Sequence, residues 1–202
     1  MNFDKILEIS QTLCGTQGRI DYVEHLYEVA SLLPENCTVL EIGTQMGGSA
    51  TVLALTIKER GGKLHCIDPC FVEEHKRPKE YLKYYGTVSG YSKDYVIDTF
   101  KKYDINDIVT LHAGSSEEIL ETIDKNILFD MVFIDGCHQY RPVKIDLKWL
   151  ERTKDDAIVM FDDWIVPVKQ AADEYFTEHT NWKNMTDGSF FPIWFQKQKK
   201  GG

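Results

Sequence analysis

Short apolar runs alternate with amphipathic stretches along the chain from about residue 38 onward. The apolar runs are rich in β-branched residues and end at polar or turn-forming residues, which is typical of strands that are buried on both faces of a sheet. The amphipathic stretches carry apolar residues at helical spacing, and several begin with a serine that can cap a helix. The alternation predicts an α/β fold with a mostly parallel sheet.

Five strands are predicted, at residues 38–42, 63–67, 109–113, 129–134 and 157–161. Helices are predicted around them, at residues 21–33, 49–59, 92–103, 116–124, 141–152 and 168–178. WKNMT and FPIWF, separated by Asp187, Gly188 and Ser189, predict a hairpin within residues 180–198 that lies antiparallel at the sheet edge. The expected architecture is a seven-stranded, mostly parallel sheet with helices on both faces.

A chain of 202 residues can bury one substantial core, so a single domain over residues 1–202 is expected. Residues 1–37 form its predicted N-terminal helical segment and residues 38–163 its ligand-binding core. Residues 70–95 are rich in tyrosine and too long for a tight connection, which favours a lid, with a contact in a homo-oligomer as the alternative.

The formal charge of -9 argues against a general nucleic-acid binder, since backbone phosphates call for a basic surface. The sequence has neither a leader pattern nor an apolar stretch of membrane-spanning length, so we expect a cytoplasmic protein without a membrane partner. The five cysteines show no paired spacing and are interpreted as reduced, structural thiols rather than as a disulfide framework or a zinc site.

Acidic residues follow two of the predicted strands. Asp135 ends the strand in FDMVFIDGCHQY, and Asp162 and Asp163 end the strand in AIVMFDDW. The carboxyl ends of parallel strands open onto one crevice, so these carboxylates are expected to converge on a cation. The alternative is that Asp162 and Asp163 cap the following helix.

A glycine-containing turn joins the first predicted strand to the next helix in VLEIGTQMGGSA. Gly43, Gly47 and Gly48 let a ligand approach the backbone closely, although they could also serve tight strand-to-helix packing. The spacing matches neither the dinucleotide fingerprint nor a phosphate-binding Walker loop. Glu41, inside the strand, would repel a pyrophosphate and favours a cationic ligand such as a sulfonium. Asp68, at the next strand end, can accept hydrogen bonds from ribose hydroxyls or cap a turn before Pro69.

Taken together, VLEIGTQMGGSA, HCIDP, HAGSSEEIL, FIDGCHQYRPVKIDLKWL and VMFDDW resemble the class I S-adenosylmethionine-dependent methyltransferases, over most of residues 20–195. Within them, the pairing of IDG-x-H-x-Y with a later FDD is most similar to the metal-dependent O-methyltransferases that include the macrocin and mycinamicin sugar methyltransferases. The resemblance implies a Rossmann-like fold, S-adenosylmethionine as cofactor and a divalent cation, with Mg²⁺ the first choice and Mn²⁺ another candidate.

The resemblance also implies roles for individual residues. Asp135, Asp162 and Asp163 would hold the cation. Asp68 would bind the ribose, Ser115 and Ser116 the adenine edge, and the methionine end would lie among Glu41, Gly43, Gly47, Ser49 and Asp135. His138, three residues after Asp135, would act as the base that accepts the proton of the acceptor hydroxyl, with Asp135 as its catalytic partner. Some relatives have an aspartate base where this chain has Cys137, and a purely structural His138 is the alternative.

The sequence therefore predicts an O-methyltransferase that acts on a hydroxyl of a saccharide or a glycosylated small molecule. A catechol or another vicinal diol is the alternative acceptor, because two oxygens could chelate the same cation. A catalytically silent binding protein with the same fold is the alternative outside enzymes, and an NAD-dependent oxidoreductase is disfavoured by the glycine spacing.

Overall fold

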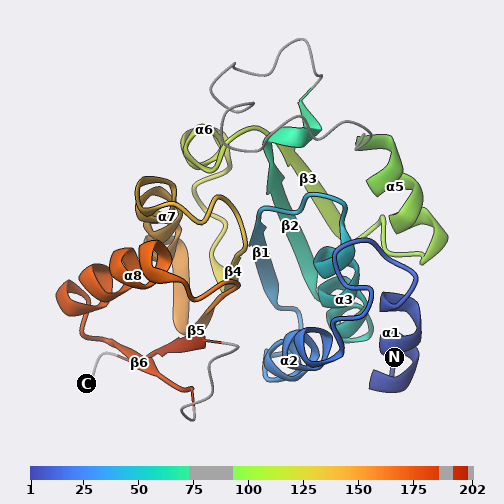
Figure 1. Cartoon of the computed structure of the whole chain (residues 1–202), viewed down its shortest axis with the longest axis horizontal. Coiled ribbons are helices and arrows are strands. Elements are labelled where there is room, and N and C mark those ends of the chain that lie inside the picture. Colours follow the sequence, from blue (N-terminus) through green and yellow to red (C-terminus); the bar gives the residue numbers. More distant parts are fainter. Residues whose placement is uncertain (73–92, 187–192, 200–202) are drawn as a thin grey trace.

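The computed structural model describes residues 1–72, 93–186 and 193–199. Its centre is a seven-stranded sheet in the order β3-β2-β1-β4-β5-β7-β6 (Figure 1). The strands are β1 (Thr38–Ile42), β2 (Lys63–Asp68), β3 (Val109–Ala113), β4 (Phe129–Ile134), β5 (Thr153–Phe161), β6 (Trp182–Asn184) and β7 (Ile193–Lys197).

Neighbouring strands from β1 to β5 pair in parallel, with Leu40 opposite both His65 and Val132. β7 pairs antiparallel with β5, and β6 pairs antiparallel with β7 at the sheet edge. The predicted mostly parallel sheet with an antiparallel C-terminal hairpin is thereby confirmed. The predicted hairpin turn and most of the predicted lid lie outside the described residues.

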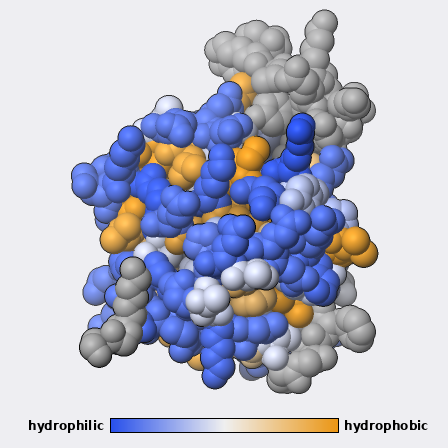
Figure 2. Space-filling model, turned by 90° about the vertical axis from the view of Figure 1, so that its left-hand side faces the viewer, coloured by the Kyte–Doolittle hydropathy of each residue, from blue (hydrophilic) through white to orange (hydrophobic). Residues whose placement is uncertain are grey.

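Helices cover both faces of the sheet (Figure 1). One layer holds α1 (Phe3–Ser10), α2 (Ile20–Ser31), α3 (Gly48–Ile57) and α5 (Lys93–Lys102), and the other holds α6 (Ser116–Thr122), α7 (Tyr140–Asp146) and α8 (Val166–Glu178). Three 3-10 helices complete the described elements: η1 (Lys58–Arg60), η2 (Pro69–Phe71) and η4 (Leu147–Arg152). On the face that α7 and α8 cover, hydrophilic residues predominate among the described ones (Figure 2).

The alternation of side chains along each strand divides the core in two. Val39, Met131 and Met160 pack with the layer of α1 to α5, whereas Leu40 and Val132 pack with α6 to α8. Every residue of β4 is buried, as expected for a central parallel strand.

Two features of the helices differ from the predictions. α1 lies within the predicted N-terminal helical segment, but its own range was not predicted, although Ile6 and Ile9 bury one of its faces. The predicted helix over residues 141–152 ends at Asp146 and continues as the 3-10 helix η4. In addition, α3 is buried on all sides, because α1 and α2 cover the surface that it turns away from the sheet.

His65 of β2 and His112 of β3 form a stacked pair, with Nδ1 of His65 2.9 Å from Nε2 of His112. Both residues are half-buried. Burial lowers the pKa of His65 to about 4, and it also lowers the pKa of His112. The folded protein therefore binds fewer protons here than the unfolded chain does once the pH falls below the ordinary value of about 6.5.

This pair should make the protein less stable in acid. The pair does not change the free energy of unfolding with pH above about pH 6.5, and it lowers that free energy as the pH falls from there toward 4. Between pH 7 and pH 5, we expect the free energy of unfolding to fall less in His65→Gln than in the unmodified protein. Urea unfolding at the two pH values measures this difference. His25→Gln, on α2, is the control. If its free energy of unfolding changed with pH in the same way as that of His65→Gln, the prediction would be contradicted.

Candidate active site

The glycine turn, residues 43–47, and two acidic residues come together at the carboxyl edge of the sheet. Gly43 follows β1, Asp135 follows β4, and Asp162 follows β5. Because β1, β4 and β5 are adjacent, hydrogen bonds continue beyond the strands, from Asp135 N to Ile42 O at 2.9 Å and from Asp162 N to Ile134 O at 3.0 Å. The predicted convergence of the strand ends is a direct consequence of this strand order.

Gly43 is needed where the turn passes the end of β4. Its φ is +95°, and a Cβ at this position would lie 2.1 Å from the carbonyl oxygen of Asp135. The backbone of Gln45 also has a positive φ, of 46°, and its N–H donates to Asp68 Oδ2 at 2.6 Å. The turn is therefore held tightly between the ends of β4 and β2.

Glu41 lies beneath the turn and is completely buried. Neither of its carboxylate oxygens has a well-formed hydrogen bond with the described residues, although the side chains of Ser49 and Thr44 are near enough to favour its charged form. Burial raises the pKa of Glu41 to about 7. A buried carboxylate without firm partners is costly, which is typical of a position that serves a ligand.

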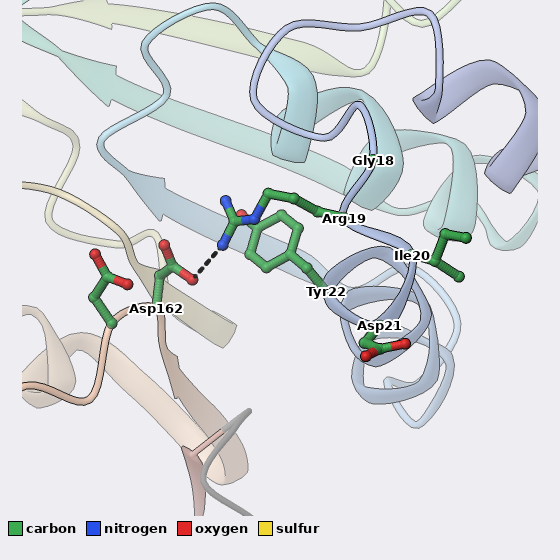
Figure 3. A pocket seen from close by; sticks show the side chains of 7 residues that line it. Gly18, Arg19, Ile20, Asp21, Tyr22 and Asp162 are labelled. Atoms are coloured by element: carbon green, nitrogen blue, oxygen red, sulfur yellow. Dashed lines mark hydrogen bonds and ion pairs between the residues drawn. The ribbon is translucent and has the colours of Figure 1, made fainter.

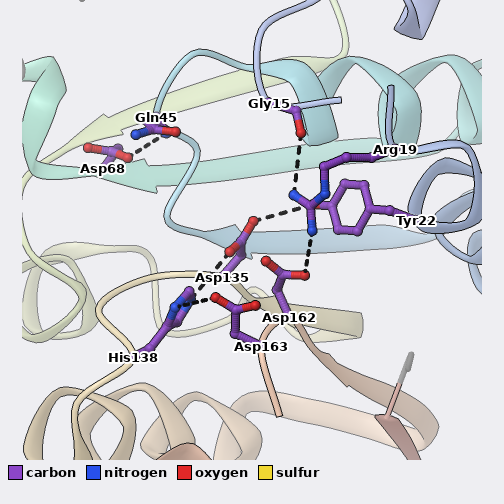
Figure 4. A network of polar contacts seen from close by, with 9 residues as sticks. All are labelled: Gly15, Arg19, Tyr22, Gln45, Asp68, Asp135, His138, Asp162 and Asp163. Atoms are coloured by element: carbon purple, nitrogen blue, oxygen red, sulfur yellow. Dashed lines mark hydrogen bonds and ion pairs between the residues drawn. The ribbon is translucent and has the colours of Figure 1, made fainter. Parts of the chain in front are cut away.

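Three side chains form a compact cluster beside the turn (Figure 4). Ligand atoms of Asp135, His138 and Asp162 all lie within 4.8 Å of one another. His138 Nε2 is 3.4 Å from Asp135 Oδ1 without meeting hydrogen-bond geometry, and His138 Nδ1 is 2.9 Å from Asp163 Oδ2. His138 thus lies between two carboxylates.

Electrostatics in the cluster favour a bound cation. Burial raises the pKa of Asp135, and the charge of Asp162 adds to the rise, while contact with His138 opposes it. The same contact raises the pKa of His138 above its ordinary value. Asp162 is buried and Asp135 is partly buried, and their carboxylates lie close together. A positive charge placed between them would relieve this repulsion.

Asp163, the third predicted cation ligand, lies outside the compact cluster. Its half-exposed carboxylate contacts His138, and its backbone φ is 42°, in the left-handed region. Such strain costs free energy and persists where the surrounding structure fixes it, which is frequent at functional sites. The structure thus places Asp163 beside the predicted base, and ligation of a cation by Asp163 stays a prediction.

The predicted adenine contacts have partners of their own. Ser115 caps α6 and exchanges hydrogen bonds with Glu118 in a capping box. Ser116 Oγ accepts a hydrogen bond from Trp149 Nε1 at 2.9 Å. Both serines follow the end of β3, at the carboxyl edge of the sheet. Their contact with an adenine, like that of Asp68 with a ribose, stays a prediction.

Two residues of the site were missed by the sequence analysis. Arg19 belongs to the N-terminal loop, residues 11–19, and Tyr22 to the first turn of α2. The Arg19 guanidinium lies 3.8 Å from the centre of the Tyr22 ring and pairs with Asp162, while Tyr22 donates to Asp135 Oδ2 at 3.3 Å. The only local signal is the pair of glycines at 15 and 18, both with positive φ, ahead of the helix.

Two cavities meet at this cluster. The turn cavity, of about 200 Å³, lies between the glycine turn, the start of α3, and the N-terminal loop, and Ser49, Asp135 and Asp162 also line it. The aspartate cavity, of about 500 Å³, is lined by residues 18–22 and by Asp162 and Asp163 (Figure 3). Arg19, Tyr22 and Asp162 line both, so a ligand in one cavity would lie next to a ligand in the other.

Comparison with sequence families gives a match over residues 40–164, more than half of the chain, to a family described as a methyltransferase domain. An uncharacterized protein of Acanthamoeba polyphaga mimivirus is 28% identical over 133 residues, which are 64% of this chain and 52% of the relative. The chain thus spans about half the length of this curated relative.

Several solved structures are similar to the chain. The O-methyltransferase NovP has a TM-score of 0.70 at 18% identity, over 89% of this chain and 81% of NovP. The O-methyltransferase TomG from Streptomyces achromogenes, in complex with SAM, has a TM-score of 0.59 at 18% identity, over 96% of this chain and 86% of TomG. At such identities these likenesses show the fold alone, and they confirm the predicted Rossmann-like methyltransferase fold.

Among the helices of the described residues, none combines the length and the apolar character that crossing a bilayer requires.

Proposed function

Because this chain belongs to the methyltransferase-domain family, we propose that it transfers a methyl group from S-adenosylmethionine to a hydroxyl of a saccharide or a glycosylated small molecule, with the help of a divalent cation. The observation that carries the proposal is the convergence of the glycine turn with Asp135, His138 and Asp162 at one edge of the sheet. The methyltransferase family was expected from the sequence and is confirmed. The metal-dependent sugar subgroup remains part of this proposal.

The turn cavity fits the methionine end of the cofactor. Gly43 lines the cavity and lets the turn pass close to the end of β4. Buried oxygens of Glu41 and Thr44 lack firm partners among the described residues. Carboxylates around the cavity would favour the ammonium and the sulfonium, as the charge of Glu41 suggested. When bound, S-adenosylmethionine supplies an electrophilic methyl group. Gly43, Gly47 and Ser49 would position its methionine end, and Asp68 its ribose.

The acidic cluster fits a hard divalent cation. Asp135 and Asp162 offer carboxylate oxygens at a partly enclosed site, which suits Mg²⁺ or Mn²⁺. The cation would lower the pKa of a coordinated acceptor hydroxyl. Asp163 is the third proposed ligand, reached by a rotation of its half-exposed side chain away from His138.

His138 is the proposed base. Methyl transfer breaks a C–S bond of the sulfonium and forms a C–O bond, and the hydroxyl proton must leave as the oxygen attacks. His138 lies between Asp135 and Asp163, where carboxylates fix its orientation and stabilise the imidazolium that forms when it accepts the proton. The position of His138 supports a mechanism in which Asp135 contacts both the proposed base and the proposed cation.

The acceptor class is proposed from the resemblance to known O-methyltransferases and from the lining of the neighbouring cavity. IDG-x-H-x-Y and the later FDD resemble the sugar O-methyltransferases, and TomG is an O-methyltransferase involved in tomaymycin synthesis. The aspartate cavity adjoins the cluster and is lined by the carboxylates of Asp21, Asp162 and Asp163. Such a lining suits a polyhydroxylated molecule, because carboxylates accept hydrogen bonds from hydroxyls.

Calorimetric titration tests the cofactor assignment. The purified protein is titrated with S-adenosylmethionine and with NAD, each with Mg²⁺ and again with excess chelator. We expect binding of S-adenosylmethionine and no binding of NAD. A panel of saccharide and catechol acceptors, assayed by transfer of a labelled methyl group, then tests the acceptor class. Failure to bind S-adenosylmethionine would overturn the proposed function, and turnover of catechols alone would overturn the saccharide assignment.

His138→Ala should lower the rate constant of methyl transfer by roughly 100-fold to 10,000-fold, the range typical of general-base catalysis. Affinity for S-adenosylhomocysteine should change much less, because His138 faces Asp135 and Asp163 and does not line the turn cavity. Single-turnover rates and calorimetric titration separate the two effects. His179→Ala, at the residue that follows the last residue of α8, is the control. An unchanged single-turnover rate in His138→Ala would assign His138 a structural role.

A further inference from the structure

Arg19 reaches from the N-terminal loop across the Tyr22 ring to the wall between the two cavities (Figures 3 and 4). Its Nη2 donates to Asp162 Oδ1 at 3.2 Å, and its Nη1 donates to the carbonyl oxygen of Gly15 at 3.3 Å. The Tyr22 ring supports the guanidinium from one side at 3.8 Å. The side chain is nevertheless 43% exposed, so these contacts orient the guanidinium without enclosing it.

Charge is distributed unequally around the cavities. Among the described residues that line them, Arg19 is the one cation, whereas Asp21, Asp135, Asp162 and Asp163 are acids. The methionine end proposed for the turn cavity carries both an ammonium and a carboxylate. The acids can receive the ammonium, but they would repel the carboxylate. A positive partner within reach of the cavity would offset this repulsion and favour a bound carboxylate.

Arg19 has the capacity to be that partner. A guanidinium carries five N–H donors in a planar fork, and its hydrogen bonds with the described residues use two of them. The fork matches the two oxygens of a carboxylate, and such pairs are among the strongest hydrogen bonds in proteins. Its weak hydration and its contact with the Tyr22 ring also lower the cost of burying the charge under a ligand.

We propose that Arg19 binds the carboxylate of the cofactor's methionyl group and thereby positions the cofactor in the turn cavity. This inference rests on the proposed function and adds to it a recognition residue from outside the family match, which begins at residue 40. Arg19 is a positioning residue and takes no part in the proton or methyl transfer.

The test compares two ligands that differ in the carboxylate. Calorimetry measures binding of S-adenosylhomocysteine and of its decarboxylated analogue to the full chain, to Arg19→Gln and to Arg19→Lys. We expect Arg19→Gln to weaken binding of S-adenosylhomocysteine about 10-fold to 100-fold, the effect of losing a charge-assisted hydrogen-bonded pair. Binding of the decarboxylated analogue should change by less than about 3-fold. Arg19→Lys keeps the charge without the fork and should lie between the two.

Lys63→Gln is the control for the loss of one positive charge, since Lys63 is exposed at the opposite end of β2. It should bind both ligands like the unmodified protein. Thermal unfolding verifies that each variant is folded, and Arg19→Lys carries the comparison if Arg19→Gln does not fold. Equal losses for both ligands, or no loss for either, would overturn the assignment of Arg19 while leaving the proposed function intact. Absence of binding to the unmodified protein would overturn both.

Discussion

Asp162→Asn is expected to lower the rate of metal-dependent methyl transfer by roughly 100-fold to 1,000-fold, which corresponds to a loss of several kcal/mol of transition-state stabilisation by a bound cation. Asp162 is buried beside Asp135, and its carboxylate belongs to the compact cluster with His138. An amide keeps the shape of the side chain but removes the charge. We therefore expect cation affinity and turnover to fall together.

Stability should respond differently in the same variant. Asparagine weakens the pair with Arg19, whose partly exposed side chain makes such a pair worth about 0–1 kcal/mol. It also removes the repulsion that helps to raise the pKa of Asp135. These effects oppose one another, so the free energy of unfolding should change by less than about 1 kcal/mol. A proportionate loss of stability and activity would instead show that Asp162 is structural.

Three measurements complete the test of Asp162→Asn: turnover against Mn²⁺ concentration, Mn²⁺ affinity by titration, and urea unfolding. Asp155→Asn is the matched control, because Asp155 is an exposed aspartate near the beginning of β5, the strand that Asp162 follows. It should behave like the unmodified protein. Full turnover of Asp162→Asn in the presence of a chelator would contradict the metal assignment.

The sheet could be predicted from the sequence because its strands are local patterns. A strand buried on both faces reads as a short apolar run, and the ranges 38–42, 109–113 and 129–134 coincide with β1, β3 and β4. β5 begins four residues before its predicted start, at Thr153, because polar residues open it. The meeting of Gly43, Asp135 and Asp162 follows from strand order, since residues at the carboxyl ends of adjacent parallel strands are neighbours.

The remaining parts of the site depend on contacts between distant segments. Arg19 precedes its partner Asp162 by 143 positions, and Tyr22 precedes Asp135 by 113. No periodicity links an arginine in a loop to an acid that follows a strand. Likewise, the sequence places His138 three residues from Asp135 but does not reveal that Asp163 contacts its other nitrogen. Such pairs arise only when the N-terminal loop and the loop after β5 are brought to the same edge.

Gly43→Ala is expected to abolish cofactor binding and to destabilise the fold by about 3 kcal/mol or more. An alanine at a left-handed φ costs about 1–2 kcal/mol by itself. Here the new Cβ would also lie 2.1 Å from the carbonyl oxygen of Asp135 and 2.6 Å from the Cα of Gly136. Both obstacles are backbone atoms, so a change of rotamer cannot relieve the overlap, and overpacking of this kind typically costs another 1–3 kcal/mol, roughly.

The overlap can be relieved only if the end of β1 moves away from the end of β4. Restoring an ordinary contact distance between packed atoms would require a shift of more than about an ångström. That movement would shift the glycine turn relative to Asp135 and would deform the turn cavity, which both of them line. The proposed cofactor site and the proposed cation site would therefore lose their mutual alignment. Urea unfolding and titration with S-adenosylhomocysteine measure the two consequences separately.

Gly61→Ala separates backbone strain from damage to the site. Gly61 has a φ of +73°, but the atom nearest to its added Cβ is the side-chain oxygen of Asn36, which can rotate away. We expect this variant to lose about 1–2 kcal/mol of stability and to keep its affinity for S-adenosylhomocysteine. If Gly43→Ala matched Gly61→Ala in both measurements, the close approach of the turn to β4 would have no role in binding. A selective loss in Gly43→Ala would instead mean that the contact between these two strand ends sets the geometry of the cofactor site.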